Sequence, residues 1–266
     1  MAIQPEPPGQ EAPADRTTRR GGWRFGVWLA ALVVGTGGLA ASAAGVSAQL
    51  LPRTFTPAQQ QQIMTWETAG RWRALPAGDI FPATVTYQLP AYAISSNSSQ
   101  LALKAYRVGI ARQSTCAAAS DAAAAKVLSA DRCAAELRAT YTDETDSMLV
   151  TVGVAVMPGN NAAKSAAGAL SAGQGLHPGV RTAAFRSTLA QAFSNRQRQL
   201  SWAVSSGPYL IMSTVGYVDG LPRVPVASNP YADQEMTSFA TGVADAIGSP
   251  LGALPVSPKC PGAPGC

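Results

Sequence analysis

A long uncharged run near the N-terminus constrains this chain more than any other feature of its sequence. Residues 25–52 contain no Asp, Glu, Lys or Arg. The stretch from Phe25 to Gly45 is long enough to cross about 30 Å of hydrocarbon as a helix. Four arginines precede the run, and basic residues stay on the cytoplasmic side, so the rest of the chain is predicted to lie outside the cytoplasm. These arginines are Arg16, Arg19, Arg20 and Arg24.

The run permits two interpretations. Its first half, FGVWLAALVV, is strongly apolar, whereas the second half, GTGGLAASAAG, is rich in small residues. Small residues after a short apolar centre are typical of a cleavable signal, and a cut near Ala48 would release a secreted chain. The long leader at residues 1–24, whose Pro, Glu and Gln content indicates disorder, favours a retained helix instead. We therefore expect residues 25–48 to form a single-pass transmembrane helix, with secretion as the alternative.

The cysteines agree with export, since all four follow the uncharged run. An even number of cysteines in an exported segment indicates disulfides, and four cysteines allow three pairings. We favour Cys116–Cys133 and Cys260–Cys266. The first bond closes a loop of about 18 residues, which contributes roughly 3 kcal/mol through chain entropy. No CxxC pair is present, so no metal site is predicted.

The residues that follow predict an α+β domain over about 54–250. Thr56, Pro57 and Gln59 form a helix start with a capping box. Apolar patterning predicts strands at 83–89 and 101–111 and hairpins at 137–155 and 200–218, with helices at 120–130, 160–171 and 231–247. Gly248 and Pro250 are expected to end the last helix. Residues 251–266 form a Pro/Gly-rich tail with a terminal disulfide loop.

The two predicted hairpins resemble each other. LRATYTDETDSMLVTVGVA and LSWAVSSGPYLIMSTVGYV align without a gap at an offset of 63 residues, and turn residues fall at the same place in both. Each hairpin precedes a predicted helix, as does the earlier strand pair. Either a structural pseudo-repeat of ββα units or chance similarity in a chain rich in Val and Ala explains the match.

The expected architecture is a mainly antiparallel sheet of about five to seven strands, with helices mostly on one face. Two smaller ββα subdomains are the alternative. Gly109, Gly153 and Gly216 fall in the middle of strands, where glycine often marks the close approach of another element. They indicate either tight packing of helices over the sheet or a groove for a ligand.

Catalytic motifs are missing from the sequence. The single histidine, His177, precedes a proline in a Gly-rich loop, and no GxSxG accompanies it. Nothing selects a catalytic pair among Asp79, Asp121, Glu136 and Asp219. The TDETD stretch lacks the spacing of a calcium loop and reads as a solvated turn. No catalytic, cofactor-binding or metal-binding residue is predicted, and no cofactor.

The charge of the chain bears on nucleic-acid binding. The net charge is +5, yet no basic run with interleaved aromatic residues is present, so nucleic acid is not an expected partner.

Several stretches carry a resemblance of sequence style. FTPAQQQQIMTWETAGRWRALPAGDIFP, LRATYTD, VTVGVAVMP, RQRQLSWAVSSGPY and CPGAPGC follow the Arg-flanked apolar run. Together they resemble uncharacterised membrane-anchored or secreted proteins of high-GC Gram-positive (actinobacterial) bacteria. The resemblance covers most of residues 16–266 and assigns no functional residue.

These features predict a membrane-anchored, extracytoplasmic, non-enzymatic domain for protein interaction or ligand sensing in the cell envelope. Expected partners are the cytoplasmic membrane and envelope proteins. The alternatives are a secreted enzyme that acts on the envelope and a carrier of a small molecule or lipid. Converging carboxylates, or a serine beside a base, would indicate the enzyme. A closed apolar cavity larger than roughly 300 Å³ would indicate the carrier.

Overall fold

The computed structural model describes residues 55–89, 101–172, 176–223 and 230–259. The chain divides into two units, Met1–Phe55 and Thr56–Cys266, and every described helix and strand belongs to the second. Within the described ranges, no helix has the length and apolar character needed to cross a membrane. The leader and the helix expected at 25–48 lie outside these ranges, so both stay predictions.

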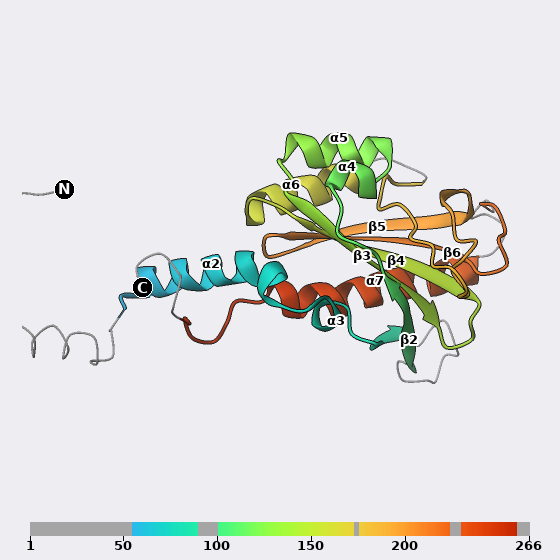
Figure 1. Cartoon of the computed structure of the whole chain (residues 1–266), viewed down its shortest axis with the longest axis horizontal. Helices are drawn as coiled ribbons and strands as arrows, with labels where there is room; N and C mark the ends of the chain where they lie inside the picture. The colour runs from blue at the N-terminus through green and yellow to red at the C-terminus, as the bar shows by residue number, and fades with distance from the viewer. Residues whose placement is uncertain (1–54, 90–100, 173–175, 224–229, 260–266) are drawn as a thin grey trace, which may run out of the picture. The chain divides into compact units, whose positions relative to one another are not determined.

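A six-stranded sheet forms the centre of the second unit, in the order β1-β2-β3-β4-β6-β5 (Figure 1). Every neighbouring pair of strands is antiparallel. The prediction of an α+β fold with a mainly antiparallel sheet is confirmed. The strands are β1 (Thr84–Leu89), β2 (Leu101–Ile110), β3 (Ala135–Asp143), β4 (Met148–Val156), β5 (Arg198–Ser206) and β6 (Tyr209–Tyr217).

Each pair of consecutive strands is followed by helical structure, as the ββα order predicted. All three pairs join one sheet, so the alternative of two separate subdomains is wrong. Helices α4 (Cys116–Ala119) and α5 (Ala122–Ala130) follow β2, α6 (Asn160–Leu170) follows β4, and α7 (Pro230–Gly252) follows β6. Helices α2 (Pro57–Ala74) and α3 (Ala77–Ile80) precede the sheet, and the short 3₁₀ helix η2 (Asn195–Gln197) leads into β5.

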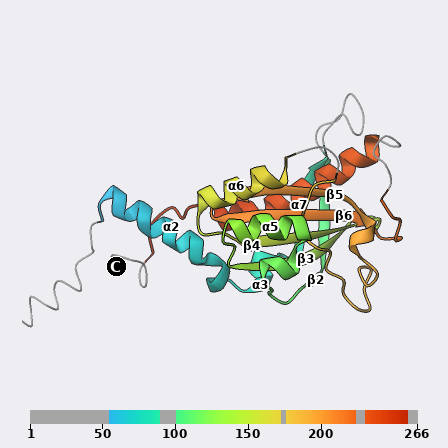
Figure 2. The ribbon, with the colours of Figure 1, turned by 90° about the horizontal axis from the view of Figure 1, so that it is seen from above.

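Helices cover both faces of the sheet, which corrects the expectation that they lie mostly on one (Figures 1 and 2). Helix α7 packs on one face, here called the α7 face, and α4, α5 and α6 lie over the other, called the α6 face. The reason is visible in β4, where Val150 and Val152 point to the α7 face while Ala155 points to the α6 face. A strand that is apolar on both sides must be covered on both sides.

Two helix boundaries predicted from the sequence, the start of α2 and the end of α7, have different outcomes. Thr56 caps α2 with the predicted capping box to Gln59. Helix α7, by contrast, continues through Gly248 and Pro250 to Gly252, so the predicted stop is wrong. Tertiary contacts stabilise this last turn, because the Ser206 hydroxyl donates to the Gly248 carbonyl at 2.8 Å and Arg71 binds carbonyls further along.

The connection between α6 and β5 crosses the α6 face, and residues 178–183 of it are here called the crossing segment. Threonines of the sheet hold this segment. The Thr214 hydroxyl donates to the Val180 carbonyl at 2.7 Å, and the Ala183 N–H donates to the Thr151 hydroxyl at 3.0 Å. Residues after the segment continue over the same face, where Phe193 packs with Leu149. Irregular chain therefore shares this face with α4, α5 and α6.

Candidate functional site

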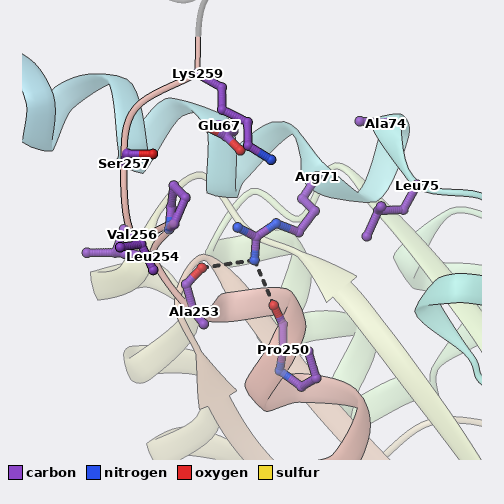
Figure 3. A pocket seen from close by; sticks show the side chains of 11 residues that line it. Glu67, Arg71, Ala74, Leu75, Pro250, Ala253, Leu254, Val256, Ser257 and Lys259 are labelled. Atoms are coloured by element: carbon purple, nitrogen blue, oxygen red, sulfur yellow. Dashed lines mark hydrogen bonds between the residues drawn. The ribbon is translucent and has the colours of Figure 1, made fainter.

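An open hollow of about 650 Å³ lies between the second half of α2 and the chain that ends and follows α7 (Figure 3). Most of its lining is apolar, and three charged side chains lie among the apolar ones. The lining residues are Glu67, Arg71, Ala74, Leu75, Pro250, Ala253, Leu254, Pro255, Val256, Ser257 and Lys259.

One stripe of α2 forms the helical wall of the hollow. Glu67, Arg71 and Ala74 are spaced by four and three residues, which places them on a single face of the helix, and Leu75 is the C-terminal cap that follows them. Another part of α2 is fixed to the sheet by Tyr209. Its hydroxyl donates to the Thr68 carbonyl at 2.6 Å and accepts the Trp72 N–H at 3.2 Å, so it is inserted into the hydrogen-bond ladder of the helix.

Arg71 joins the two walls. Its Nη1 donates to the carbonyls of Pro250, Leu251 and Ala253 at 2.7, 2.9 and 2.9 Å. The last carbonyls of a helix lack intrahelical partners, and a positive charge is favourable at this end of the helix dipole. Arg71 therefore supplies hydrogen-bond donors to the carbonyl groups at the end of α7, and it holds the tail that follows α7 against α2.

Among the described polar side chains that line the hollow, Glu67 has a carboxylate oxygen without a hydrogen-bond partner. Its Oε2 is buried and has no hydrogen-bond partner among the described residues. Figure 3 shows Lys259 extending toward Glu67, but the two side chains form no ion pair within the part of the chain that the structure describes. A buried acceptor without a donor is unfavourable. A ligand that displaces Lys259 and brings a donor to this oxygen would therefore gain a hydrogen bond.

Apolar side chains at the rim of the hollow are open to solvent. Leu75 is 36% exposed and Leu254 47% exposed, while Val256 is fully exposed. Neighbouring apolar side chains exposed beside a concave surface mark binding sites more often than single ones do.

The hollow meets neither condition set out for the alternative functions. It is open rather than enclosed, and Glu67 is its single carboxylate. Ser257 and Lys259 both line it, but no hydrogen bond joins them in the described part of the chain. The hollow therefore offers a largely apolar surface with one carboxylate, and such a surface is suited to binding a ligand.

A second group of polar side chains is buried under the crossing segment, around Glu136 on β3. None of the surface of Glu136 is exposed. The Ser120 hydroxyl donates to its Oε2 at 2.9 Å, while its Oε1 has no partner among the described residues. Burial raises the pKa of Glu136 to about 8, although the Ser120 hydrogen bond and the charge of Arg138 oppose the shift. The carboxyl is therefore mainly uncharged at neutral pH, and a dissolved substrate has no access to it.

Asp121 and Arg198 form an ion pair beside this group, with 2.6 Å between Oδ2 and Nη1. Asp121 also caps α5 through the Ala124 N–H and accepts the Gly179 N–H, each at 2.9 Å. Burial alone would raise the pKa of Asp121, but these hydrogen bonds and Arg198 lower it below its ordinary value. Asp121 thus ties α5, β5 and the crossing segment together. Its role is structural.

The other residues singled out in the sequence lie apart from the hollow. Cys116 and Cys133 form the predicted disulfide, and Cys260 and Cys266 lie outside the described residues. Exposed carboxylates at Asp79 and Asp219 lie on α3 and after β6. No group of three or more His, Cys, Asp or Glu side chains placed to hold a metal ion occurs among the described residues.

The strand glycines do not form a groove. A Cβ built on Gly109 would lie 2.6 Å from the Phe185 ring, and one on Gly153 would lie 2.7 Å from Glu136 Oε1 and 2.9 Å from Val180. The close approach was predicted correctly. Over Gly109 and Gly153 the covering element is the crossing segment and the residues after it, whereas a Cβ on Gly216 would lie 2.5 Å from the carbonyl oxygen of Gln197 in the 3₁₀ helix η2.

Sequence reasoning missed the hollow. The sequence of α2 did contain an indication of the hollow. The spacing of Glu67, Arg71 and Ala74 places two charged side chains on one face of the helix. The tail supplied Leu254 and Val256 between prolines. Neither stretch indicated that the two would meet, since about 180 residues separate Arg71 from the carbonyls that it binds. No protein-family model, no curated protein and no solved structure matches this chain.

Proposed function

We propose that this chain is a non-enzymatic binding domain held at the outer face of the cytoplasmic membrane, and that its hollow receives a segment of an envelope protein. The hollow itself carries the proposal. It is open, largely apolar, and contains a buried carboxylate oxygen without a partner among the described residues.

The lining defines the chemistry of the segment. Leu75, Leu254 and Val256 favour apolar side chains, whose burial stabilises a complex by about 25 cal/mol per Å² before the cost of ordering is subtracted. Glu67 favours a lysine or arginine, because a charged donor makes the stronger hydrogen bond to a carboxylate. The proposed partner segment therefore combines apolar residues with one basic residue.

The distance along the chain keeps the hollow near the membrane. The expected transmembrane helix ends near Ala48, and α2 begins at Pro57. A connection of this length spans at most roughly 30 Å when fully extended. The domain therefore stays within reach of segments that other membrane proteins place just outside the bilayer.

Site-specific photo-cross-linking in intact membranes tests the proposal. A photoreactive residue in place of Val256, which is fully exposed beside the hollow, is expected to form a discrete adduct with one envelope protein. The same residue in place of Thr86, which is exposed on β1, is the control and is expected to give none. Equal labelling from both positions, or no adduct from Val256, would contradict the proposal.

The charge of Glu67 provides the second arm of the test. Glu67→Gln keeps the shape of the side chain and is expected to reduce the adduct severalfold, because it removes the attraction for a basic residue. Asp219→Asn removes a carboxylate that does not line the hollow and is expected to leave the adduct unchanged. An adduct that ignores the Glu67 substitution would exclude this hollow as the site.

A further inference from the structure

The crossing segment, residues 178–183, covers a carboxyl group inside the fold. Glu136 lies beneath it on β3 and has none of its surface exposed. The Val180 side chain of the segment is also fully buried, and it packs beside the carboxyl over Gly153. A Cβ built on Gly153 would lie 2.7 Å from Glu136 Oε1 and 2.9 Å from Val180. The carboxyl therefore meets water when the segment moves away from the sheet.

The surroundings of Glu136 supply too few hydrogen bonds for an ionised carboxylate. The two oxygens of a carboxylate offer about four acceptor positions. The Ser120 hydroxyl donates to Oε2 at 2.9 Å, while Oε1 has no partner among the described residues. Burial of a charged carboxylate with a single donor is strongly unfavourable. The closed segment therefore favours the protonated, uncharged form of Glu136.

The charged groups around Glu136 do not compensate for the lost solvation. The charge of Arg138 on β3 only partly opposes the effect of burial on the pKa of Glu136. Arg138 Nη1 donates instead to the carbonyl of Arg181 in the crossing segment at 3.2 Å, and the Arg181 side chain is exposed. Asp121, before α5, is paired with Arg198 of β5. The sequences of α4, β4 and β6 contain no Asp, Glu, His, Lys or Arg.

The crossing segment is irregular chain that can leave the sheet without breaking it. No residue of this described segment belongs to a helix or to one of the six strands. Its backbone is held by hydrogen bonds at separate points, such as the Thr140 hydroxyl to the Ala183 carbonyl at 2.8 Å and the Arg181 N–H to the Ala119 carbonyl at 2.7 Å. Water can replace these partners while the strand ladder stays intact. Such a local opening costs less free energy than global unfolding.

We propose that the crossing segment is a pH-sensitive cover, which separates from the sheet as Glu136 loses its proton to water. The carboxyl is protonated under the closed segment, and water solvates the carboxylate once the segment opens. The closed segment raises the pKa of Glu136 from 4.5 to about 8, and opening returns it toward its ordinary value. Between these two values, each pH unit raises the ratio of open to closed chains by up to about tenfold. The closed state is therefore favoured in acid and weakened as pH rises.

Hydrogen exchange of the full chain in detergent, followed by mass spectrometry, measures this opening. Exchange times are scaled at each pH for the intrinsic exchange rate of exposed amides. Peptides that contain the amides of Gly179, Arg181 and Ala183 are expected to lose protection by roughly tenfold per pH unit between pH 6 and 7.5. They are also expected to exchange faster than peptides from β4, because the sheet stays folded. Constant protection over this range, or protection equal to that of β4, would refute the cover.

Two substitutions test whether Glu136 is the group that responds to pH. Glu136→Gln keeps the shape of the side chain without a proton to lose, and it is expected to make the corrected exchange of the segment independent of pH. His177→Gln is the control, because His177 is the single histidine of the chain and lies directly before the segment. It is expected to leave the pH dependence unchanged. A dependence that persists in Glu136→Gln, or that disappears in His177→Gln, would overturn the role of Glu136.

Thr214→Val weakens the attachment of the segment without changing the carboxyl. It removes the hydrogen bond from the Thr214 hydroxyl to the Val180 carbonyl, and it is expected to speed exchange of the segment severalfold at every pH. The pH dependence is expected to match that of the unsubstituted chain. Unfolding midpoints check that each variant is folded, and Thr214→Val tests the cover independently of Glu136→Gln. Exchange of the segment that Thr214→Val leaves unchanged would contradict a local opening.

Discussion

At the scale of single residues, Glu136 dominates the pH response expected of this fold. Its carboxyl lies under the crossing segment beside Ser120 and Arg138, and Gly153 leaves the space that Oε1 occupies. Burial raises its pKa from 4.5 to about 8. The folded state therefore binds a proton more tightly than the unfolded state does.

Stability is expected to fall as pH rises from about 5 to 8. The contribution of Glu136 is complete below its unfolded pKa and is lost as pH rises through its folded pKa, because the folded state holds the extra proton in between. The slope for one proton is at most about 1.4 kcal/mol per pH unit. Glu136→Gln keeps a neutral side chain of the same shape and is expected to flatten the dependence. Denaturant unfolding between pH 5.5 and 8.5 measures both chains. Parallel curves would show that Glu136 does not cause the slope.

Tyr209 is the second residue with a specific expected effect. Its hydroxyl bonds to Thr68 and Trp72 of α2. Tyr209→Phe removes both bonds and is expected to destabilise the docking of α2 by about 1–2 kcal/mol, since a buried backbone acceptor and donor lose a partner. Faster proteolysis after Arg71 and Arg73 is the readout. Tyr217→Phe is the control, because the Tyr217 hydroxyl has no hydrogen-bond partner in the described residues, and it should leave the proteolysis rate unchanged.

At the scale of elements, the disulfide joins the start of α4 to the residue pair before β3. Cys116 and Cys133 are 17 residues apart in sequence. Replacing both by alanine is expected to lower the free energy of unfolding by roughly 3 kcal/mol, because the unfolded chain regains the entropy of the open loop. Denaturant unfolding of the oxidised chain and the variant measures the difference. Dithiothreitol should destabilise the unsubstituted chain more than the variant, which retains only the predicted Cys260–Cys266 bond of the tail, and equal midpoints in all samples would contradict the expectation.

The two similar hairpins are related by the pairing of β4 with β6. Thr151 and Thr214, which align at the offset of 63, are direct partners in this ladder. Leu149 pairs with Gly216, and Gly153 pairs with Met212. At the offset of 63, Leu149 aligns with Met212 and Gly153 aligns with Gly216, so each of these two pairs maps onto the other. An approximate two-fold axis therefore passes between the threonines, which supports a structural pseudo-repeat. The two threonine hydroxyls bind opposite ends of the crossing segment.

The repeat is imperfect for a physical reason. The β3–β4 hairpin pairs Thr142 with Leu149, whereas the shorter turn of the other hairpin pairs Ser206 with Tyr209. The registers differ by two residues, so the same faces of the strands stay buried. In the longer turn, the Asp143 carboxylate accepts the N–H groups of Ser147 and Met148 at 2.9 and 2.7 Å. Asp143 is 3% exposed at the end of β3, whereas residues 144–147 of the turn are exposed, so the prediction of a solvated turn is confirmed for the turn itself.

At the scale of the whole molecule, location is the property that the sequence addresses most directly. The chain is expected to fractionate with membranes, because the uncharged run behind four arginines is long enough to span them. Protease added outside should digest the domain and leave a fragment of roughly 50 residues. A chain recovered from the medium with Gln49 at its N-terminus would establish secretion instead.

Much of the fold followed from local chemistry. Thr56 and Gln59 predicted the start of α2, alternating valines predicted β4, and the turn residues predicted two hairpins. The expectation of export, together with the even number of cysteines, predicted the bond between Cys116 and Cys133. These features depend on neighbours in sequence or on the general chemistry of thiols outside the cytoplasm, so residue order alone determines them.

Contacts between distant segments decided the rest. The apolar side chains on both sides of β4 require cover on both faces, but which helix covers which face depends on how α6 and α7 return to the sheet, and periodicity within each helix does not determine the side. Helix α7 passes its predicted stop because Ser206 and Arg71 satisfy its last carbonyls. The hollow exists because Arg71 reaches chain about 180 residues away. Glu136 is buried because the crossing segment covers it. The sequence by itself determined most of the elements and their order, whereas long-range packing alone decided which side chains meet, since the free energy of burial depends on the assembled structure.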